Sequence, residues 1–127
     1  MSFTIEDMIL TGEKKYEMKF LAGQNGWANS ISWVHLLEDT TIIQNFWGKE
    51  LAVTTGLGFP QKEDWMNLAR KLNRYHASGL IINVGQYINE IPEELRAYCD
   101  ENDLPLLTVP WEVHLSDMIK DFSIRVF

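Results

Sequence analysis

Cysteine is almost absent from this chain of 127 residues, which contains Cys99 alone. A single cysteine cannot form a disulfide within the chain, so a disulfide-stapled scaffold is excluded and a cytoplasmic location is expected. Glycine and proline are also few (8 and 4 residues), which excludes a collagen-like fibre. Because the apolar runs fall short of the roughly 20 residues that cross a bilayer, we expect no membrane association.

Basic residues are outnumbered, with 11 lysines and arginines against 18 aspartates and glutamates and a net charge of −7. A compact acidic domain repels nucleic acid phosphates unless it carries a basic patch. Lys14 and Lys15 are an isolated pair, and Arg70, Lys71 and Arg74 alternate with apolar positions. We therefore expect no direct nucleic acid contact by this chain.

Motifs for metals and cofactors are also missing. The three histidines have no spacing that suggests a shared metal site. Gln61 stands where a dinucleotide fingerprint beginning at Gly56-Leu57-Gly58 needs its third glycine, and no P-loop sequence follows. Cys99 lies on an apolar helical stripe, which predicts a buried small hydrophobe rather than a nucleophile. We expect no cofactor and no metal.

Three short apolar runs mark the middle of the chain, at residues 51–55, 80–84 and 106–109. Continuous runs of this length are typical of strands buried on both faces, as in parallel sheets. Two patterns of helical period lie between them, and the first places one set of side chains on one face: Trp65, Leu68, Ala69, Leu72 and Tyr75. The alternation predicts an α/β fold, in which a small βαβαβ unit forms a parallel or mixed sheet flanked by helices. Residues 1–127 are expected to form a single domain.

Further elements are predicted before this unit. A helix is expected after Thr4, which can cap it together with Asp7. Two β segments follow at residues 18–22 and 31–36. Asn25-Gly26 between them is a turn signal, so these two segments are expected to pair as an antiparallel unit.

A last helix is predicted near the C-terminus, capped by Ser116 or Asp117. Its apolar stripe continues towards Phe127 without a capping glycine, which favours a domain excised from a longer protein. A stripe cut off in this way needs a partner. We therefore expect a homo-oligomer that forms through the C-terminal helix.

The predicted parallel strands also place candidate binding residues on one edge of the sheet. Ligands of open parallel sheets bind beyond the carboxyl ends of the strands, where loops and helix N-termini meet. Hydroxyls, an amide and the free N–H groups near glycines can bind an oxygen-rich or heterocyclic molecule there. The candidate ligand-binding residues are Thr54, Thr55, Gly56, Asn83 and Gly85, with His35 and Glu38 as polar neighbours.

Each candidate has a structural explanation as well. The glycines can serve only to turn the chain from strand to helix, and His35 can be a hydrogen-bonded histidine in the core. Glu38 and Asp39 can act as a general-base pair or form the acidic first turn of a short helix. Trp111 can stack on a flat ligand or simply cover the edge of the core.

Three stretches carry a resemblance to a known family. Residues 32–38 read SWVHLLE, residues 48–58 read GKELAVTTGLG and residues 104–110 read LPLLTVP. In this order and spacing they resemble the WVH…E, GGELLLTTGLG and LPLLEVP segments in the N-terminal domain of PucR-type purine catabolism transcriptional regulators. The sequence departs from the family at Lys49, which replaces a glycine, and at Asp39-Thr40, which replaces Asp-Pro. Lys49 places a cation either near the mouth of the crevice or only at the surface.

The resemblance implies a sensory or regulatory domain, not an enzyme, from regulators whose C-terminal helix-turn-helix binds DNA. The first interpretation is a domain that binds a small-molecule effector, such as a purine breakdown product. The second is a dimerisation or interaction module without a ligand. The third is a small enzyme that uses His35 or Glu38 as its acid or base.

Overall fold

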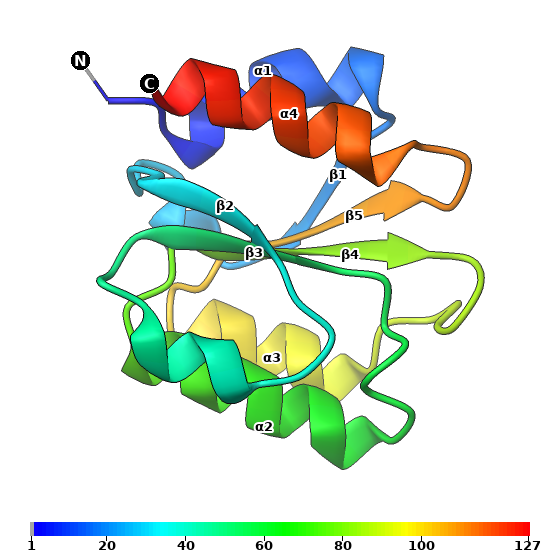
Figure 1. Ribbon diagram of the computed structural model, residues 1–127. Helices are drawn as coiled ribbons and strands as arrows, with labels where there is room; N and C mark the ends of the chain where they lie inside the picture. The colour runs from blue at the N-terminus through cyan, green and yellow to red at the C-terminus, as the bar shows by residue number, and fades with distance from the viewer. Residues whose placement is uncertain (1) are drawn as a thin grey trace.

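The chain forms three layers, with one five-stranded sheet between two pairs of helices (Figure 1). A computed structural model describes residues 2–127. Four strands run parallel in the order β5-β4-β3-β2, and β1 pairs antiparallel with the outer edge of β5. The elements are α1 (Ile5–Lys15), β1 (Lys19–Ala22), η1 (Gln24–Gly26), β2 (Trp33–Leu36), η2 (Thr41–Asn45), β3 (Glu50–Thr54), α2 (Lys62–Arg74), β4 (Gly79–Val84), α3 (Glu93–Glu101), β5 (Leu106–Pro110) and α4 (Leu115–Val126).

The central strands are apolar on both faces because helices cover both faces. Leu51 and Val53 of β3 pack into the core beneath α1 and α4, whereas Ala52 between them packs into the core beneath α2 and α3. β4 alternates in the same way, with Ile81 on the first side and Ile82 on the second. This confirms the predicted βαβαβ unit and its parallel strands.

The predicted helices are present with the predicted faces inward. In α1 the Thr4 hydroxyl accepts a hydrogen bond from the Asp7 N–H, and the Asp7 carboxylate accepts one from the Thr4 N–H, which forms a capping box. In α2 four of the five predicted positions are buried, and Tyr75 is the residue that ends the helix. α4 begins at Leu115 after His114, so its start lies slightly before the predicted caps.

The predicted pairing of the first two β segments is wrong. β1 and β2 lie at opposite edges of the sheet, and β2 runs parallel to β3. Gly23 and Gly26 approach the backbone and ring of the segment before β5 so closely that a Cβ would lie 2.1 Å from Leu104 O and 2.6 Å from Pro105 Cδ. The chain therefore turns along the end of the sheet instead of folding back as a hairpin.

α4 is fastened to α1 by a cluster around Asp121. Its carboxylate accepts hydrogen bonds from Tyr16 (2.6 Å), from Lys15 (3.0 Å) and from Arg125 (2.9 Å). Burial opposes ionisation of this side chain, but the hydrogen bonds outweigh it and lower the pKa of Asp121 to about 2. Burial and the bond to Asp121 raise the pKa of Tyr16.

Both ends of the described chain meet at the start of β2. The Phe3 carbonyl accepts a hydrogen bond of 2.8 Å from the Ile31 N–H. The ring of Phe127 lies edge-on to that of Trp33, with centroids 5.7 Å apart. Figure 1 shows the two ends on the same side of the molecule.

Candidate functional site

The carboxyl ends of β2, β3, β4 and β5 form one edge of the sheet, here named the carboxyl rim. The sequence predicts ligand contacts there, and the parallel order of these strands brings their ends together. The opposite edge, where the same strands begin, is named the amino rim.

Three predicted residues meet at the carboxyl rim in a hydrogen-bonded group, here named the rim clamp. The Glu38 carboxylate accepts hydrogen bonds from the Thr54 hydroxyl (2.8 Å) and the Thr55 N–H (3.0 Å), and it also accepts one from the Thr55 hydroxyl. The Thr54 hydroxyl accepts a further hydrogen bond from the Gly56 N–H (3.1 Å). The rim clamp thus ties the end of β3 to the segment that follows β2.

The glycines of the carboxyl rim let the chain approach itself closely. Gly56 has φ +92° and Gly85 has φ +129°, backbone conformations that favour glycine. A Cβ on Gly85 would lie 2.9 Å from Cβ of Trp111. One on Gly58 would lie 1.5 Å from the Glu38 carbonyl oxygen, so a backbone approach requires that glycine too. These contacts agree with the structural explanation of the glycines.

Asn83 joins the ends of β4 and β5. Its side chain is buried, and its Nδ2 donates a hydrogen bond of 2.9 Å to the Pro110 carbonyl oxygen. Just beyond it, the rings of Tyr87 and Trp111 meet edge to face, with centroids 5.9 Å apart. Both rings are open to solvent, with 48% and 38% of their residue surfaces exposed. The sequence reasoning did not single out Tyr87, although an aromatic residue two positions after Gly85, the glycine that follows β4, is a usable signal.

His35 and Glu38 are not joined to each other. The His35 ring is half-buried and stacks on Phe46, with centroids 5.3 Å apart, whereas the Glu38 carboxylate is held by the two threonines. The acidic-turn interpretation is wrong, because Glu38 and Asp39 precede η2 and its first turn contains no acidic residue. Asp39 instead accepts hydrogen bonds from the N–H and the hydroxyl of Thr41 at the start of η2. These bonds lower the pKa of Asp39.

The remaining chemical candidates lie away from the carboxyl rim. Cys99 is fully buried, as predicted, and burial raises the pKa of its thiol to about 12. Lys49 precedes β3 and lies at the amino rim. Within residues 2–127, no three histidine, cysteine or acidic side chains gather as a metal site would require, and no helix has the length and hydropathy needed to cross a membrane.

Comparison with known proteins identifies the family. The model of the purine catabolism regulatory protein-like family (PucR) matches residues 9–126. The purine catabolism regulatory protein of Bacillus subtilis (strain 168) is 24% identical over 100 residues, which are 78% of this chain and 19% of that protein. The chain thus spans about a fifth of the length of this curated relative. With nearly all of its length matched, the chain belongs to the purine catabolism regulatory protein-like family.

Proposed function

We propose that this chain is the effector-sensing domain of a cytoplasmic transcriptional regulator, and that it binds a small, flat metabolite at the carboxyl rim. Membership of a family of purine catabolism regulators supports a regulatory role. A purine or one of its breakdown products is the ligand class that agrees best with the family description.

The exposed aromatic pair is the observation that carries the proposal. Small-molecule sites combine aromatic surface with a few polar groups that fix orientation, and aromatic rings stack on flat ligands. Tyr87 and Trp111 supply that surface at the ends of β4 and β5. The proposed contacts nearby are the polar and glycine residues of the carboxyl rim: Thr54, Thr55, Gly56, Asn83 and Gly85, with His35 and Glu38 beside them.

The rim clamp supplies a mechanism for a response. A ligand atom that accepts a hydrogen bond from the Thr55 hydroxyl competes with Glu38, which receives that bond in the present structure. Loss of the bond loosens the link between β3 and the segment after β2. The ligand shifts the domain between these two arrangements only by as much as it binds one of them more tightly.

A thermal-shift screen of purines and their breakdown products tests this proposal. A ligand present at 100 times its dissociation constant raises the unfolding free energy by about 2.7 kcal/mol. The double variant Thr55→Val/Asn83→Leu and the single variant Trp111→Ala should lose this stabilisation, whereas Ser116→Ala on exposed α4 surface should keep it. A flat response of the unmodified chain across the set would contradict the ligand, and an unchanged response of the variants would contradict its location.

Association of two copies is the second candidate function. Met118 and Phe122 of α4 are buried in the chain's own core, so much of the predicted apolar stripe is already covered. Ile124 and Phe127 remain 63% and 97% exposed, and the ring of Phe127 lies against the partly exposed Trp33 of β2. We propose that any homo-oligomer uses this end of α4. Sedimentation should then show a dimer that Ile124→Asp dissociates, and a monomer at high protein concentration would contradict it.

A further inference from the structure

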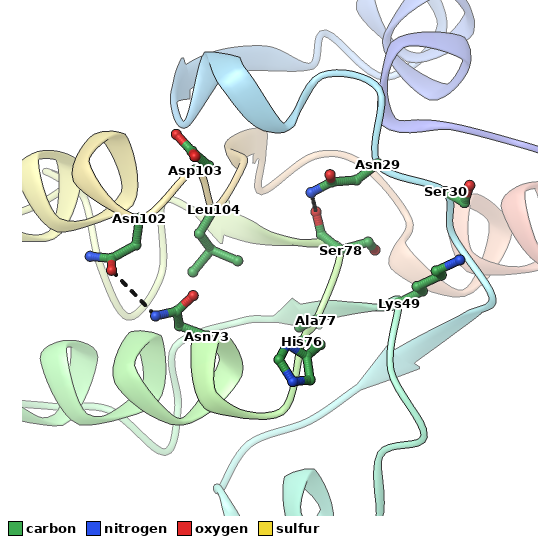
Figure 2. A pocket seen from close by; sticks show the side chains of 10 residues that line it. All are labelled: Asn29, Ser30, Lys49, Asn73, His76, Ala77, Ser78, Asn102, Asp103 and Leu104. Atoms are coloured by element: carbon green, nitrogen blue, oxygen red, sulfur yellow. Dashed lines mark hydrogen bonds between the residues drawn. The ribbon is translucent and has the colours of Figure 1, made fainter.

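A polar cleft of about 240 Å³ opens at the amino rim, here named the amino-rim cleft (Figure 2). It lies between the segments that lead into β2, β3, β4 and β5, far along the chain from one another. Eight of its ten lining residues have polar side chains, and only two are apolar. The lining residues are Asn29, Ser30, Lys49, Asn73, His76, Ala77, Ser78, Asn102, Asp103 and Leu104.

The Ser78 hydroxyl is the strongest sign that something binds there. Ser78 is 2% exposed, and its Oγ is a buried polar atom without a hydrogen-bond partner among residues 2–127. Buried hydroxyls are nearly always partnered, because an unmade hydrogen bond is costly once water has been removed. Ser78 lines the amino-rim cleft and its oxygen is closed to solvent, so a molecule in the cleft can supply the missing partner once the hydroxyl turns towards it.

Two asparagines leave hydrogen-bonding capacity in the amino-rim cleft. Asn29 donates its amide nitrogen to the Ser78 carbonyl oxygen (3.2 Å), and Asn73 donates its own to Asn102 Oδ1 (3.3 Å). Each bond fixes the orientation of the amide and leaves the carbonyl oxygen of Asn29 and of Asn73 as an acceptor. The cleft therefore offers acceptors for N–H groups.

The amino-rim cleft also holds one charge of each sign. The ion pairs formed within residues 2–127 include neither Lys49 nor Asp103. Figure 2 shows Lys49 on one side of the cleft and Asp103 on the other, with Ser78 between them. Both side chains are exposed, so the two opposite charges flank the opening of the cleft and can turn towards a ligand that carries both charges.

The backbone at Lys49 is unusual for a lysine. Lys49 has φ +70°, and its N–H donates a hydrogen bond of 2.7 Å to the His76 carbonyl oxygen, which joins two walls of the cleft. His76 and Asp103 also have positive φ, but each lies just beyond the end of a helix, where this conformation is common. No helix ends at Lys49, so glycine would be the less strained choice there. Because lysine occupies this position instead of glycine, the cleft is bordered by a positive charge.

We propose that the amino-rim cleft binds a small zwitterion of amino-acid size. Its carboxylate lies towards Lys49 and the Ser78 hydroxyl, and its N–H donors lie towards Asp103 and the carbonyl oxygens of Asn29 and Asn73. The volume is below the about 300–1,000 Å³ of sites for drug-sized ligands, which sets the size. This site is at the opposite edge of the sheet from the proposed effector site and does not depend on it.

A titration of the ¹⁵N-labelled 127-residue chain with L-glutamine, followed by NMR, tests this site. Glutamine is a zwitterion with additional amide N–H donors, whereas succinate carries only negative charge and 1,4-diaminobutane only positive charge. We expect glutamine to shift the backbone amides of Lys49, Ser78 and Asp103 more strongly than either control. No shift at these amides, or equal binding of a control compound, would overturn the proposal.

Two variants locate the contacts. Ser78→Ala removes the unpartnered hydroxyl and Lys49→Gly removes the cation while relieving the backbone, so both should fold and both should bind glutamine about tenfold more weakly. Lys14→Ala, an exposed lysine on α1, is the matched control and should bind as the unmodified chain does. Unchanged affinity in both cleft variants would refute the site. Thr55→Val should leave glutamine binding intact, which separates this result from a failure of the effector proposal.

Discussion

At the carboxyl rim the buried hydroxyl of Thr54 both donates and accepts a hydrogen bond, whereas at the amino rim the equally buried hydroxyl of Ser78 does neither. The two residues are 0% and 2% exposed, so burial alone does not distinguish them. The two hydroxyls differ in their neighbours. The Glu38 carboxylate accepts a hydrogen bond from Thr54, whereas Ser78 borders the amino-rim cleft and has no such acceptor beside it among residues 2–127. Buried polar groups whose hydrogen bonds are all made stabilise a fold, and a buried polar group without a hydrogen bond marks a place where a partner can bind.

The largest expected loss of stability follows from replacing Trp65, which packs beneath the carboxyl rim. Trp65 is 2% exposed and packs against Phe59, and its ring lies against Gly56. Trp65→Ala should lower the unfolding free energy by about 3–5 kcal/mol in urea titrations, because the cavity cannot be refilled. The half-buried Met66 on the same helix is the control, and Met66→Ala should cost much less. Equal losses would mean that the helix face does not support the rim.

The pH dependence of the unfolding free energy tests how much Asp121, which joins α4 to α1, contributes to stability. The pKa of Asp121, about 2, is below its ordinary 3.8, so the folded state favours the ionised form. Its contribution of about 2 kcal/mol is complete above about pH 4 and is lost as the pH falls towards about 2. Asp121→Asn should lose that stability at neutral pH and flatten the acid limb of the stability profile. Parallel profiles for the variant and the unmodified chain would contradict this assignment.

Replacement of Thr54 by valine breaks the rim clamp with little change in shape. The variant leaves a Glu38 oxygen and the Gly56 N–H without their partner, so the unfolding free energy should fall by about 1–3 kcal/mol. Thr108→Val on β5 is the control, since the hydrogen bonds within residues 2–127 include none from its hydroxyl. If both variants lose the same amount, the clamp adds nothing beyond ordinary packing.

Ser78→Ala should have the smallest effect and the opposite sign. Removal of an unpartnered buried hydroxyl should leave the unfolding free energy unchanged or raise it by at most about 1 kcal/mol. Thermal unfolding of the unliganded chain measures it. A loss as large as that of Thr54→Val would show that both hydroxyls are partnered, and the contrast between the rims would disappear.

The central part of the fold could be predicted because its signals are local. Runs such as residues 80–84 are apolar throughout, and the helical period around Trp65 lies within a single element. The pairing of the edge strands could not be predicted, although both strands were, because Lys19–Ala22 and Trp33–Leu36 have only four residues each and β1 pairs with β5, the last strand of the chain. Asn25-Gly26 signals a turn, but only the close contact of Gly26 with Asp103 and Pro105 decides where that turn leads.

The same long-range contacts explain what was missed at the candidate sites. Thr54, Thr55 and Glu38 were proposed as ligand contacts, and no local pattern shows that they bind one another. The amino-rim cleft exists because the chain between β1 and β2 passes along the starts of the other strands, which brings Asn29 to Ser78. The sequence predicts a hairpin in this segment, and a hairpin would not pass along the starts of the other strands, so the cleft could not be predicted.

The meeting of both chain ends at the start of β2 makes this domain suited to circular permutation. Phe3 bonds to Ile31 and Phe127 packs on Trp33, so a short peptide would bridge the ends without crossing the sheet. New ends would fit at the exposed Gln86 or Asn89, on either side of Ile88, which packs against the core. New ends there would loosen the segment that carries Tyr87 at the carboxyl rim and would leave the amino-rim cleft intact. Binding at the cleft could then be measured while the carboxyl rim is disrupted.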